Sequence, residues 1–301
     1  MISTETTNIT EFDADGLSAV RIDGLKNFKI AQIFDCGQCF RFDPVPSSRH
    51  NVEIAGVAYG RYIRLGQDTP DSVTLYNTTA YEYEKTWKHY LALDTDYNAV
   101  RCDIAARFSA AAGGNDRIMP LAMEYGDGIR ILRQEPWEAV CSFIVSQNNN
   151  IPRIKKIIAA MSREWGEPIH CGNETHYSFP SAEALVKAGE KAIFDIKTGF
   201  RAKYIYDAAC KAANGELDFS LVSSSSPDEA AETLCKIKGV GPKVAACALL
   251  FGFGKTEAFP IDVWIKRVLA KYYPDGLDIS ALGKYAGIAQ QYLFYYERYH
   301  G

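Results

Sequence analysis

The hydrophobic periodicity of this chain changes partway along its 301 residues, and that change limits the folds available to it. Over about the first hundred residues, segments such as NVEIAGVAYGRYIRL are rich in β-branched residues and tyrosine, and Gly, Asp and Pro separate them at hairpin-like intervals. From about Pro136 onward, apolar residues recur at helical spacing, as in Ile154, Ile157, Ile158 and Met161. The first part therefore predicts antiparallel sheet, and the remainder predicts mostly helix.

The same division predicts an α+β fold. We expect an antiparallel β domain over residues 1–112 and a helical domain over residues 113–301. A mass of 33.4 kDa exceeds one ordinary core, so two or three closely packed lobes are expected. Further helices are expected over about 202–213 and 285–298, each bounded by glycine or tyrosine-rich segments.

The composition is that of an ordinary globular chain. Hydrophobic residues make up 47% and charged residues 23%, which excludes a disordered, collagen-like or coiled-coil protein. The longest apolar run, over residues 244–253, is too short to span a bilayer, and the amino-terminal segment lacks the pattern of a secretory signal. We expect a cytoplasmic protein with no membrane partner, associated with the nucleoid if the source is bacterial.

Eight cysteines are too few for a disulfide scaffold of this length. Cys36 and Cys39 form one CxxC pair, but no second pair follows at zinc spacing, and the flanking residues do not indicate a βαβ redox motif. No four-cysteine cluster of the iron–sulfur type is present near the carboxyl end. We therefore expect buried free thiols, no metal and no cofactor.

Charged residues are distributed unevenly along the chain, so the net charge does not describe each region of it. A net charge of −4 disfavours a nucleic-acid partner, because phosphate contacts need surface Lys and Arg. Residues 1–100 hold 14 Asp and Glu against 9 Lys and Arg, whereas residues 236–271 hold 7 Lys and Arg against 2 Asp and Glu. A mildly acidic protein with one local basic face is therefore predicted.

A helix–hairpin–helix motif is predicted over about residues 227–252. The SPDE segment at 226–229 supplies an N-cap serine, a first-turn proline and a capping-box glutamate, so a helix should begin there and end near Ile237. Residues 238–241, with sequence KGVG, interrupt it, and Pro242 opens a second helix. Glycines permit close approach of a partner, and the free amides of a helix amino end favour an anion such as phosphate. A bend that merely turns the chain is the alternative.

Two residues beside this motif suggest chemistry. Lys243 lies in the first turn of the second helix, where a cation opposes the helix dipole instead of complementing it. It is either a solvated lysine, a phosphate contact or an amine nucleophile, which must react unprotonated. Asp262 precedes an amphipathic helix as a candidate N-cap, which is an ordinary structural role. Together, an amine and a carboxylate could displace a group from an acetal-like carbon, the carboxylate stabilising a cationic sugar transition state.

The segments GVGPKVAAC and PIDV resemble the helix-hairpin-helix, Gly/Pro, Asp superfamily of DNA glycosylases, in its lysine-bearing branch. The blocks CGQCFRF, ILRQEPWEAVCSFIVSQNNNIPRI, TGFRAKY and YAGIAQQYLF are similar, in order, to eukaryotic-type 8-oxoguanine DNA glycosylases. The resemblance covers most of the chain after about residue 25. It implies a β domain like one half of the TATA-binding protein, followed by two helical lobes that flank a cleft.

The resemblance also implies a bifunctional DNA glycosylase and AP lyase. Lys243 matches the nucleophile that attacks C1′ of the damaged nucleotide, forms a Schiff base and permits β-elimination. Asp262 matches the aspartate that assists this step. Gly239, Gly241 and Val244 match the hairpin positions whose amides bind phosphate.

By the same resemblance, four residues hold the flipped base. The carbonyl of Gly37 accepts the N7 proton that 8-oxoguanine has and guanine lacks. Cys247 and Phe294 match the residues on either side of the base, and Gln290 matches the one that reads its Watson–Crick edge. Taken without the family, Cys247 and Phe294 would be core residues.

Four further residues match the family's contacts to the DNA around the lesion. Phe200 matches the aromatic wedge, and Asn148, Arg153 and Arg201 match the residues that read the cytosine left behind. Without the family, the asparagine could be a cap, the phenylalanine core and the arginines solvated. The expected partner is double-stranded DNA with 8-oxoguanine opposite cytosine, bound by a monomer. Trp264 departs from the family, because animal enzymes usually have histidine there.

Three other functions remain open. A glycosylase for alkylated bases would use the aspartate without a lysine nucleophile. A non-catalytic DNA-binding module would use the hairpin only for phosphate, with salt-sensitive binding. A helical protein-interaction domain would use neither residue and would not bind DNA.

Overall fold

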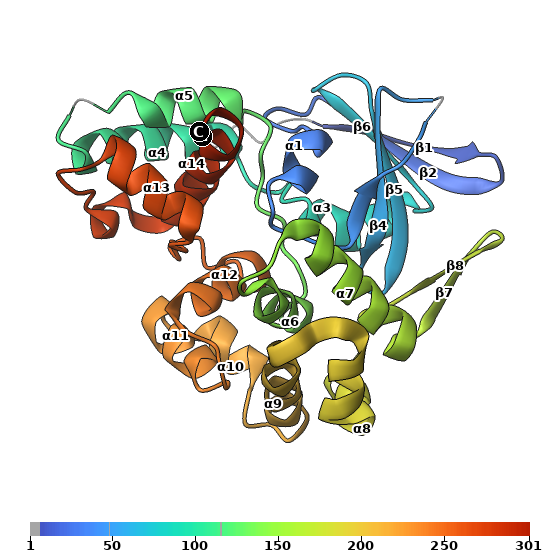
Figure 1. Ribbon diagram of the computed structural model, residues 1–301. Helices are drawn as coiled ribbons and strands as arrows, with labels where there is room; N and C mark the ends of the chain where they lie inside the picture. The colour runs from blue at the N-terminus through green and yellow to red at the C-terminus, as the bar shows by residue number, and fades with distance from the viewer. Residues whose placement is uncertain (1–6, 48, 115) are drawn as a thin grey trace.

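The computed structural model describes residues 7–47, 49–114 and 116–301. Its amino-terminal part contains the predicted antiparallel sheet, which has six strands (Figure 1). In spatial order these are β1 (Asn8–Ala14), β2 (Leu17–Asp23), β6 (Ser72–Tyr76), β5 (Arg61–Gln67), β4 (Val52–Ala58) and β3 (Phe42–Pro44).

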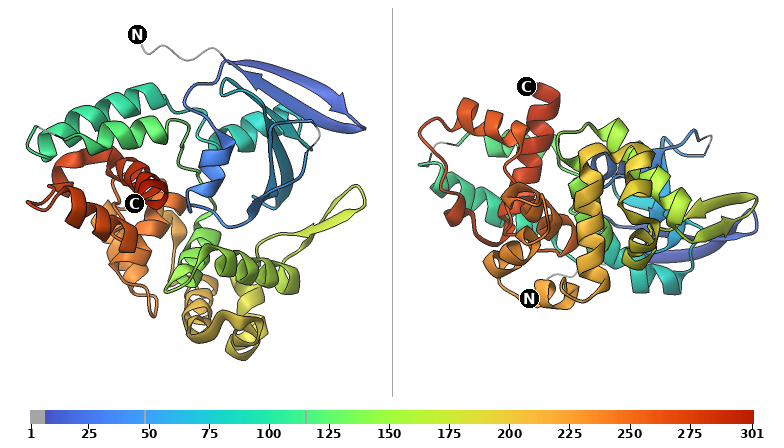
Figure 2. Two further views of the ribbon diagram at one scale, coloured as in Figure 1. Left: turned by 45° about the horizontal axis from the view of Figure 1, so that its top comes forward. Right: turned by 60° about the horizontal axis from the view of Figure 1, so that its bottom comes forward.

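The sheet packs one face against a short helix and a helical turn region, and this contact forms the first hydrophobic core. Ile22, Phe28, Ile33, Leu75 and Trp87 are among its fully buried members. Strand β1 is exposed along almost its whole length and pairs only with β2, so these two strands project as a ribbon (Figure 2). The core therefore depends on β2 and the inner strands and not on β1.

The sheet ends at Tyr76, and helices occupy most of residues 80–111, where the sequence pattern had been interpreted as sheet. These are α2 (Ala80–Glu82), the π-helical turn η1 (Tyr83–Trp87), α3 (Lys88–Tyr90) and α4 (Tyr97–Ala111), with α1 (Ile30–Asp35) preceding β3. Thr79 and Glu82 form a capping box, and Asp96 caps α4. These local caps determine the helix starts.

The remaining helices form two groups, as expected (Figure 1). One group contains α4, α5 (Ile118–Tyr125), α13 (Val263–Tyr272), η4 (Ile279–Tyr285) and α14 (Ala286–His300). The other contains α6 (Pro136–Ser146), α7 (Ile151–Trp165), α8 (Ala182–Ile193), η2 (Phe194–Thr198), η3 (Gly199–Arg201), α9 (Ala202–Ala213), α10 (Phe219–Ser224), α11 (Pro227–Cys235) and α12 (Pro242–Gly252). The helices predicted near 151–165, 202–213 and 285–298 are confirmed. The division of domains at residue 112 stays a prediction.

Helices α6 and α12 cross closely in the second group. A Cβ atom built on Gly252 would lie 2.6 Å from the Cβ of Ala139, so only glycine permits this crossing. Both helices are buried over most of their length. Their close contact fixes where α12, and hence Lys243, lies.

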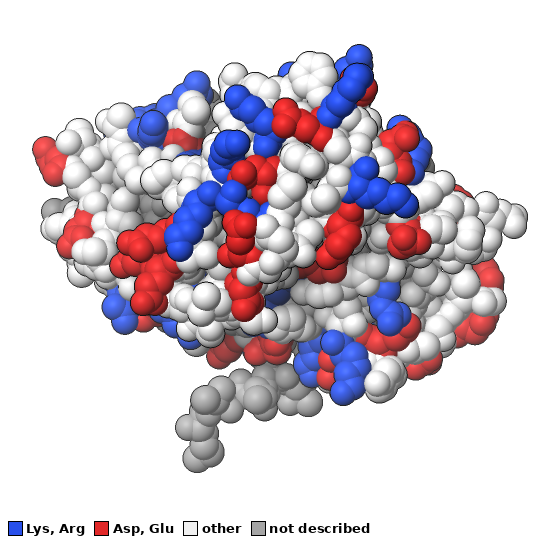
Figure 3. Space-filling view, turned by 90° about the horizontal axis from the view of Figure 1, so that it is seen from below, with Lys and Arg blue, Asp and Glu red and all other residues white. Residues whose placement is uncertain are grey.

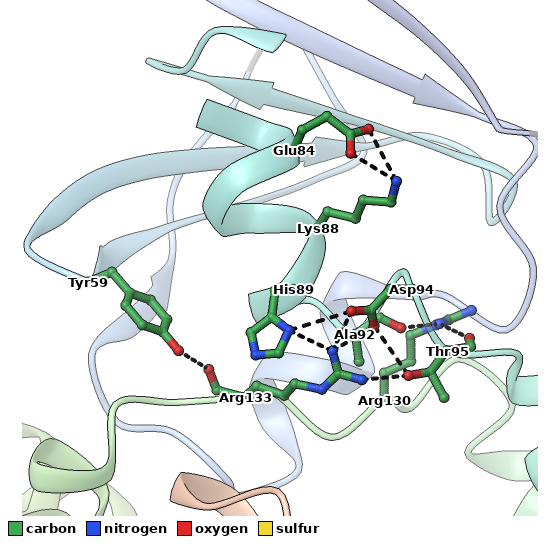
Figure 4. Close-up of polar contacts among 9 residues, drawn as sticks. All are labelled: Tyr59, Glu84, Lys88, His89, Ala92, Asp94, Thr95, Arg130 and Arg133. Carbon is green, nitrogen blue, oxygen red and sulfur yellow. Dashed lines mark hydrogen bonds and ion pairs between the residues drawn. The ribbon is translucent and has the colours of Figure 1, made fainter. Parts of the chain in front are cut away.

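The chain between α5 and α6 ties the sheet to the helices. The buried Arg130 donates to backbone carbonyls of residues 26–27 and 92–95, on two sides of the segment. Arg133 donates to Asp94 at 2.6 Å in the same region (Figure 4). These contacts restrain the junction between the lobes.

One element was not anticipated in the helical part. The strands β7 (Pro168–Cys171) and β8 (Glu174–Tyr177) form a hairpin that reaches back to the sheet. The ring of His176 stacks on Tyr62 of β5, with centroids 3.7 Å apart. Within the described part of the chain, no helix combines the length and the apolar character needed to cross a bilayer.

Candidate active site

A cavity of about 400 Å³ lies between the two helical groups and the segment that follows α1. Six of the predicted site residues line it: Gly37, Lys243, Cys247, Asp262, Gln290 and Phe294. They come from that segment, from α12, from the start of α13 and from α14 (Figure 1). Residues separated by more than 200 positions in the sequence are thus brought to one place.

The predicted helix–hairpin–helix is confirmed next to this cavity. Helix α11 begins with the Ser226–Glu229 capping box, and it ends at Cys235, two residues before the expected end. Gly239 has a φ of +73°, and a Cβ there would lie 2.4 Å from the ring of Tyr204. Gly241 is the N-cap of α12 and provides no side-chain cap. The first amides of α12 are therefore left for another acceptor.

Lys243 lies in the first turn of α12 and lines the cavity. Cys247, one turn later, is 5% exposed. Burial raises the pKa of the Cys247 thiol to about 11, and the neighbouring Lys243 amine partly offsets that rise. The thiol is thus protonated at neutral pH and presents a soft, weakly polar surface to the cavity.

Asp262 has the capping role considered for it, and it also lines the cavity. Its Oδ1 accepts a hydrogen bond from the backbone N–H of Ile265 at 2.8 Å, so the carboxylate caps α13. The same residue lines the cavity together with Lys243. Capping holds the carboxylate at the edge of the cavity, so the structural role supports a chemical one.

The other side of the cavity has polar groups without protein partners. Gln290 is 4% exposed, and its Oε1 is buried with no hydrogen-bond partner among the described residues. Gly37 has a φ of +75°, and a Cβ there would lie 3.5 Å from the ring of Phe294. A buried, unpaired amide oxygen is costly unless a ligand satisfies it, so this part of the cavity is suited to a polar, planar molecule.

The four residues expected to contact DNA around the lesion lie outside this cavity and close to one another. The guanidinium of Arg201 stacks over the ring of Phe200 at 4.4 Å and donates to the Asn148 carbonyl at 2.8 Å. Arg153 donates to the Lys197 carbonyl at 3.3 Å. Phe200 is 48% exposed, as a wedge must be, whereas Arg201 is almost fully buried. Their roles on DNA stay predictions.

Sequence reasoning missed several residues that line the cavity, including Phe251, Gln291 and Arg298. Gln291 donates through Nε2 to the carbonyl of Cys36, and Arg298 binds Asp35. A second polar residue beside Gln290 in the mainly apolar first half of α14 was the available signal for Gln291. Trp264, the departure from the family, also lines the cavity.

Cys36 and Cys39 are both buried. Burial raises the pKa of the Cys36 thiol to about 12 and raises that of Cys39 well above its usual range. Among the residues that the structure describes, no cluster of His, Cys, Asp and Glu could hold a metal ion. Both cysteines are thus buried free thiols, as expected from the sequence.

The face of the molecule seen from below carries both signs of charge. Figure 3 shows Lys and Arg interspersed with Asp and Glu over the described part of this face. The mixture agrees with the small net charge of −4. The basic residues predicted to form a local basic face over 236–271 lie in the hairpin, in α12, in α13 and in the chain between these helices, and both helices border the cavity.

Two family models match the chain. The amino-terminal domain of 8-oxoguanine DNA glycosylases matches residues 22–140, and the HhH-GPD superfamily of base excision DNA repair proteins matches residues 141–277. A probable N-glycosylase/DNA lyase of Methanothermobacter thermautotrophicus is 33% identical, over 62% of this chain and 69% of its own length. An N-glycosylase/DNA lyase of Arabidopsis thaliana is 30% identical, over 87% of this chain and 75% of its own length.

Comparison with solved structures indicates the same family. The Clostridium acetobutylicum 8-oxoguanine glycosylase/lyase, in complex with double-stranded DNA containing cytosine opposite 8-oxoguanine, superposes with a TM-score of 0.87. It is 34% identical and covers 98% of this chain and 99% of its own. The cavity, the hairpin and these relatives lead to one assignment: the chain belongs to the 8-oxoguanine DNA glycosylase family, in the helix-hairpin-helix superfamily of base excision repair proteins.

Proposed function

We propose that this protein excises 8-oxoguanine from double-stranded DNA and then cleaves the strand at the abasic site. The observation that carries this proposal is the meeting of Lys243 and Asp262 at one cavity that also holds the unpaired Gln290 oxygen. An amine, a carboxylate and a base-reading amide are the groups that a bifunctional glycosylase needs. Membership of the family supports the same activity.

The reaction begins with an extrahelical nucleotide, because C1′ and the base edges are inaccessible in stacked duplex. The lone pair of the Lys243 amine forms a bond to C1′, and the C1′–N9 bond breaks with its electron pair leaving on the base, which takes up a proton. Opening of the sugar ring gives the Schiff base. Loss of a C2′ proton then breaks the C3′–O bond. Asp262 stabilises the positive charge that develops on the sugar.

Selectivity depends on the direction of one hydrogen bond. N7 of 8-oxoguanine carries a proton and donates, whereas N7 of guanine is an acceptor. In our proposal the Gly37 carbonyl accepts that proton, Cys247 and Phe294 contact the two faces of the base, and Gln290 binds its Watson–Crick edge. Normal guanine would place the lone pair of its N7 against this carbonyl. Leaving these acceptors unsatisfied in a pocket without water costs about 1 to 3 kcal/mol of binding free energy.

The DNA around the lesion is held by two further groups of residues. The hairpin amides at Gly239, Gly241 and Val244 bind a backbone phosphate. Phe200 enters the base stack in place of the flipped nucleotide.

Asn148, Arg153 and Arg201 donate to the cytosine that the lesion leaves behind. Arg201 already donates to the backbone carbonyls of Gln147, Asn148 and Thr198, so an exchange of one of these partners would free a further donor for the cytosine. The protein acts as a monomer in the compartment that holds the DNA. In a bacterium this compartment is the cytoplasm, where the protein associates with the nucleoid.

The test is a product assay on a duplex with 8-oxoguanine opposite cytosine. The wild-type protein should release the base, nick the strand and form a covalent adduct with the DNA when borohydride is added. Lys243→Gln should abolish the adduct. Lys191→Gln, at an exposed lysine on α8, is the matched control and should trap normally. Trapping that persists in Lys243→Gln contradicts the proposal.

A substrate panel separates the remaining alternatives. Cytosine, adenine, guanine and thymine opposite the lesion give the opposite-base preference, and a duplex with an alkylated base tests for the related glycosylase activity. Release of the alkylated base without an adduct would favour that activity. Salt-sensitive binding with no base release would indicate a non-catalytic module.

A further inference from the structure

Three buried glutamines surround the segment Cys36–Gln38, which carries the proposed N7 acceptor. Gln38, Gln134 and Gln291 are 1%, 7% and 2% exposed. They come from the segment itself, from the chain before α6 and from α14. Burying three neutral amides is costly unless each is hydrogen-bonded, so their partners indicate what they are for.

Gln38 holds the carboxyl side of the segment. Its Nε2 donates to the carbonyls of Ile33 at 2.9 Å and Arg130 at 2.8 Å, and its Oε1 accepts from the N–H of Leu132 at 2.8 Å. The Gln38 carbonyl accepts from Gln134 Nε2 at 2.7 Å. The residue after Gly37 is therefore fixed by both its side chain and its backbone.

Gln291 holds the amino side. Its Nε2 donates to the carbonyl of Cys36, which belongs to the peptide immediately before Gly37. This is a contact between residues 255 positions apart, and it joins the segment to α14, the helix that also presents Gln290 and Phe294 to the cavity. Gln291 thus couples the two walls between which the base is proposed to bind.

The Gly37 carbonyl itself accepts no hydrogen bond from any residue that the structure describes. The peptides on both sides of it are fixed by hydrogen bonds, and Gly37 itself has a left-handed φ of +75° beside the Phe294 ring. We propose that Gln291 is a positioning residue: by holding the Cys36 carbonyl, it keeps the Gly37 carbonyl where N7–H of 8-oxoguanine donates. This inference rests on the proposed function and deepens it.

This positioning role predicts that a change at Gln291 affects the two activities of the site, base excision and strand cleavage, to different extents. Excision depends on reading the base, and misplacing a contact by about 1 Å costs on the order of 100-fold in rate. Strand cleavage at a preformed abasic site uses the amine and the sugar but has no base to read. A positioning role for Gln291 therefore affects excision and spares abasic-site cleavage.

The first test is Gln291→Met, which removes the donor at similar volume. Base excision from an 8-oxoguanine:cytosine duplex should fall about 10- to 100-fold in single-turnover rate. Cleavage of the same duplex carrying an abasic site should stay within about twofold. Tyr273→Phe is the matched control, because it removes the 2.8 Å hydrogen bond to Asp116 away from the cavity. That variant should leave both rates unchanged.

The second test is Gln291→Glu, whose protonated carboxyl donates to the Cys36 carbonyl while the carboxylate cannot. Its excision rate relative to wild type should recover as the pH falls, with no such recovery in Gln291→Met. Equal losses of excision and abasic-site cleavage, or no loss of either, would overturn the inference. Failure of the wild-type protein to excise 8-oxoguanine would instead refute the proposed function.

Discussion

Two helices present their amino ends to the same cavity, and they do so in opposite ways. Helix α13 is capped by the Asp262 carboxylate, which satisfies the amide of Ile265. Helix α12 begins at Gly241 with no side-chain cap, has proline at its first position and carries Lys243 in its first turn. An aspartate N-cap stabilises a helix by about 1 kcal/mol, whereas a cation near the amino end costs a few tenths. Helix stability therefore explains the aspartate cap of α13 but not the lysine in the first turn of α12.

A third amino end, away from this cavity, has proline and no side-chain cap as α12 does, but its first turn carries an acid. Helix α6 has Pro136 and Glu138 in its first turn, and Glu138 pairs with Arg41 at 3.2 Å. Acid at the amino end complements the dipole. The comparison teaches that α12 is the exception among these three helices in the charge of its first turn, and that this departure from the favoured pattern coincides with the proposed site of chemistry.

The largest expected effect separates the two roles of Asp262. Asparagine caps a helix about as well as aspartate, so Asp262→Asn should leave the thermal unfolding temperature nearly unchanged. The rate of base excision should fall about 100- to 1,000-fold, because the charge that stabilises the cationic sugar is gone. Single-turnover kinetics on the lesion duplex measure this. An unchanged rate would reduce Asp262 to a cap and remove the comparison.

The next effect concerns α6. Burial raises the pKa of Glu138 from 4.5 to about 7, and Arg41 only partly offsets the rise. The folded protein therefore holds a proton that the unfolded chain releases, and the stability due to that proton is complete below about pH 4.5 and lost as the pH rises through 7. This amounts to about 3 kcal/mol. Urea unfolding across this range should show a flatter pH dependence in Glu138→Gln than in wild type. Parallel curves would contradict it.

The smallest effects compare two glycines of one hairpin. Gly239→Ala places a Cβ against the Tyr204 ring at a positive φ and should lower the free energy of unfolding by about 2 kcal/mol. At Gly241, φ is −105° and no atom lies within 4 Å of the added Cβ, so the cost should be about 0.5 kcal/mol. Chemical denaturation of both variants gives the difference. Equal losses would mean that the hairpin backbone is not under the constraint described.

Much of the fold follows from local patterns, and for that reason it could be predicted. The Ser226–Glu229 box, the glycine hairpin and the Asp262 cap each depend on residues a few positions apart, and all three are confirmed. The β7–β8 hairpin was missed, since its strands have four residues each and its support comes from Tyr62, more than 100 positions away.

The candidate site divides in the same way. Lys243 could be singled out because it contradicts a local rule, whereas the base-contacting residues could be named only through the family. Gln291 had only a weak local signal, because its contact is with Cys36, 255 positions away. A contact between residues so far apart produces no local pattern of residue types that a single sequence would show clearly.

That separation also affects when the protein can act. Helix α14 follows every other element of the cavity along the chain, so Lys243 is synthesised before Gln290 and Phe294, the residues that we propose contact the base. The amine that we propose reacts is therefore made before the residues that we propose select the base. In our proposal, discrimination between damaged and normal nucleotides is therefore acquired only after α14 has been synthesised.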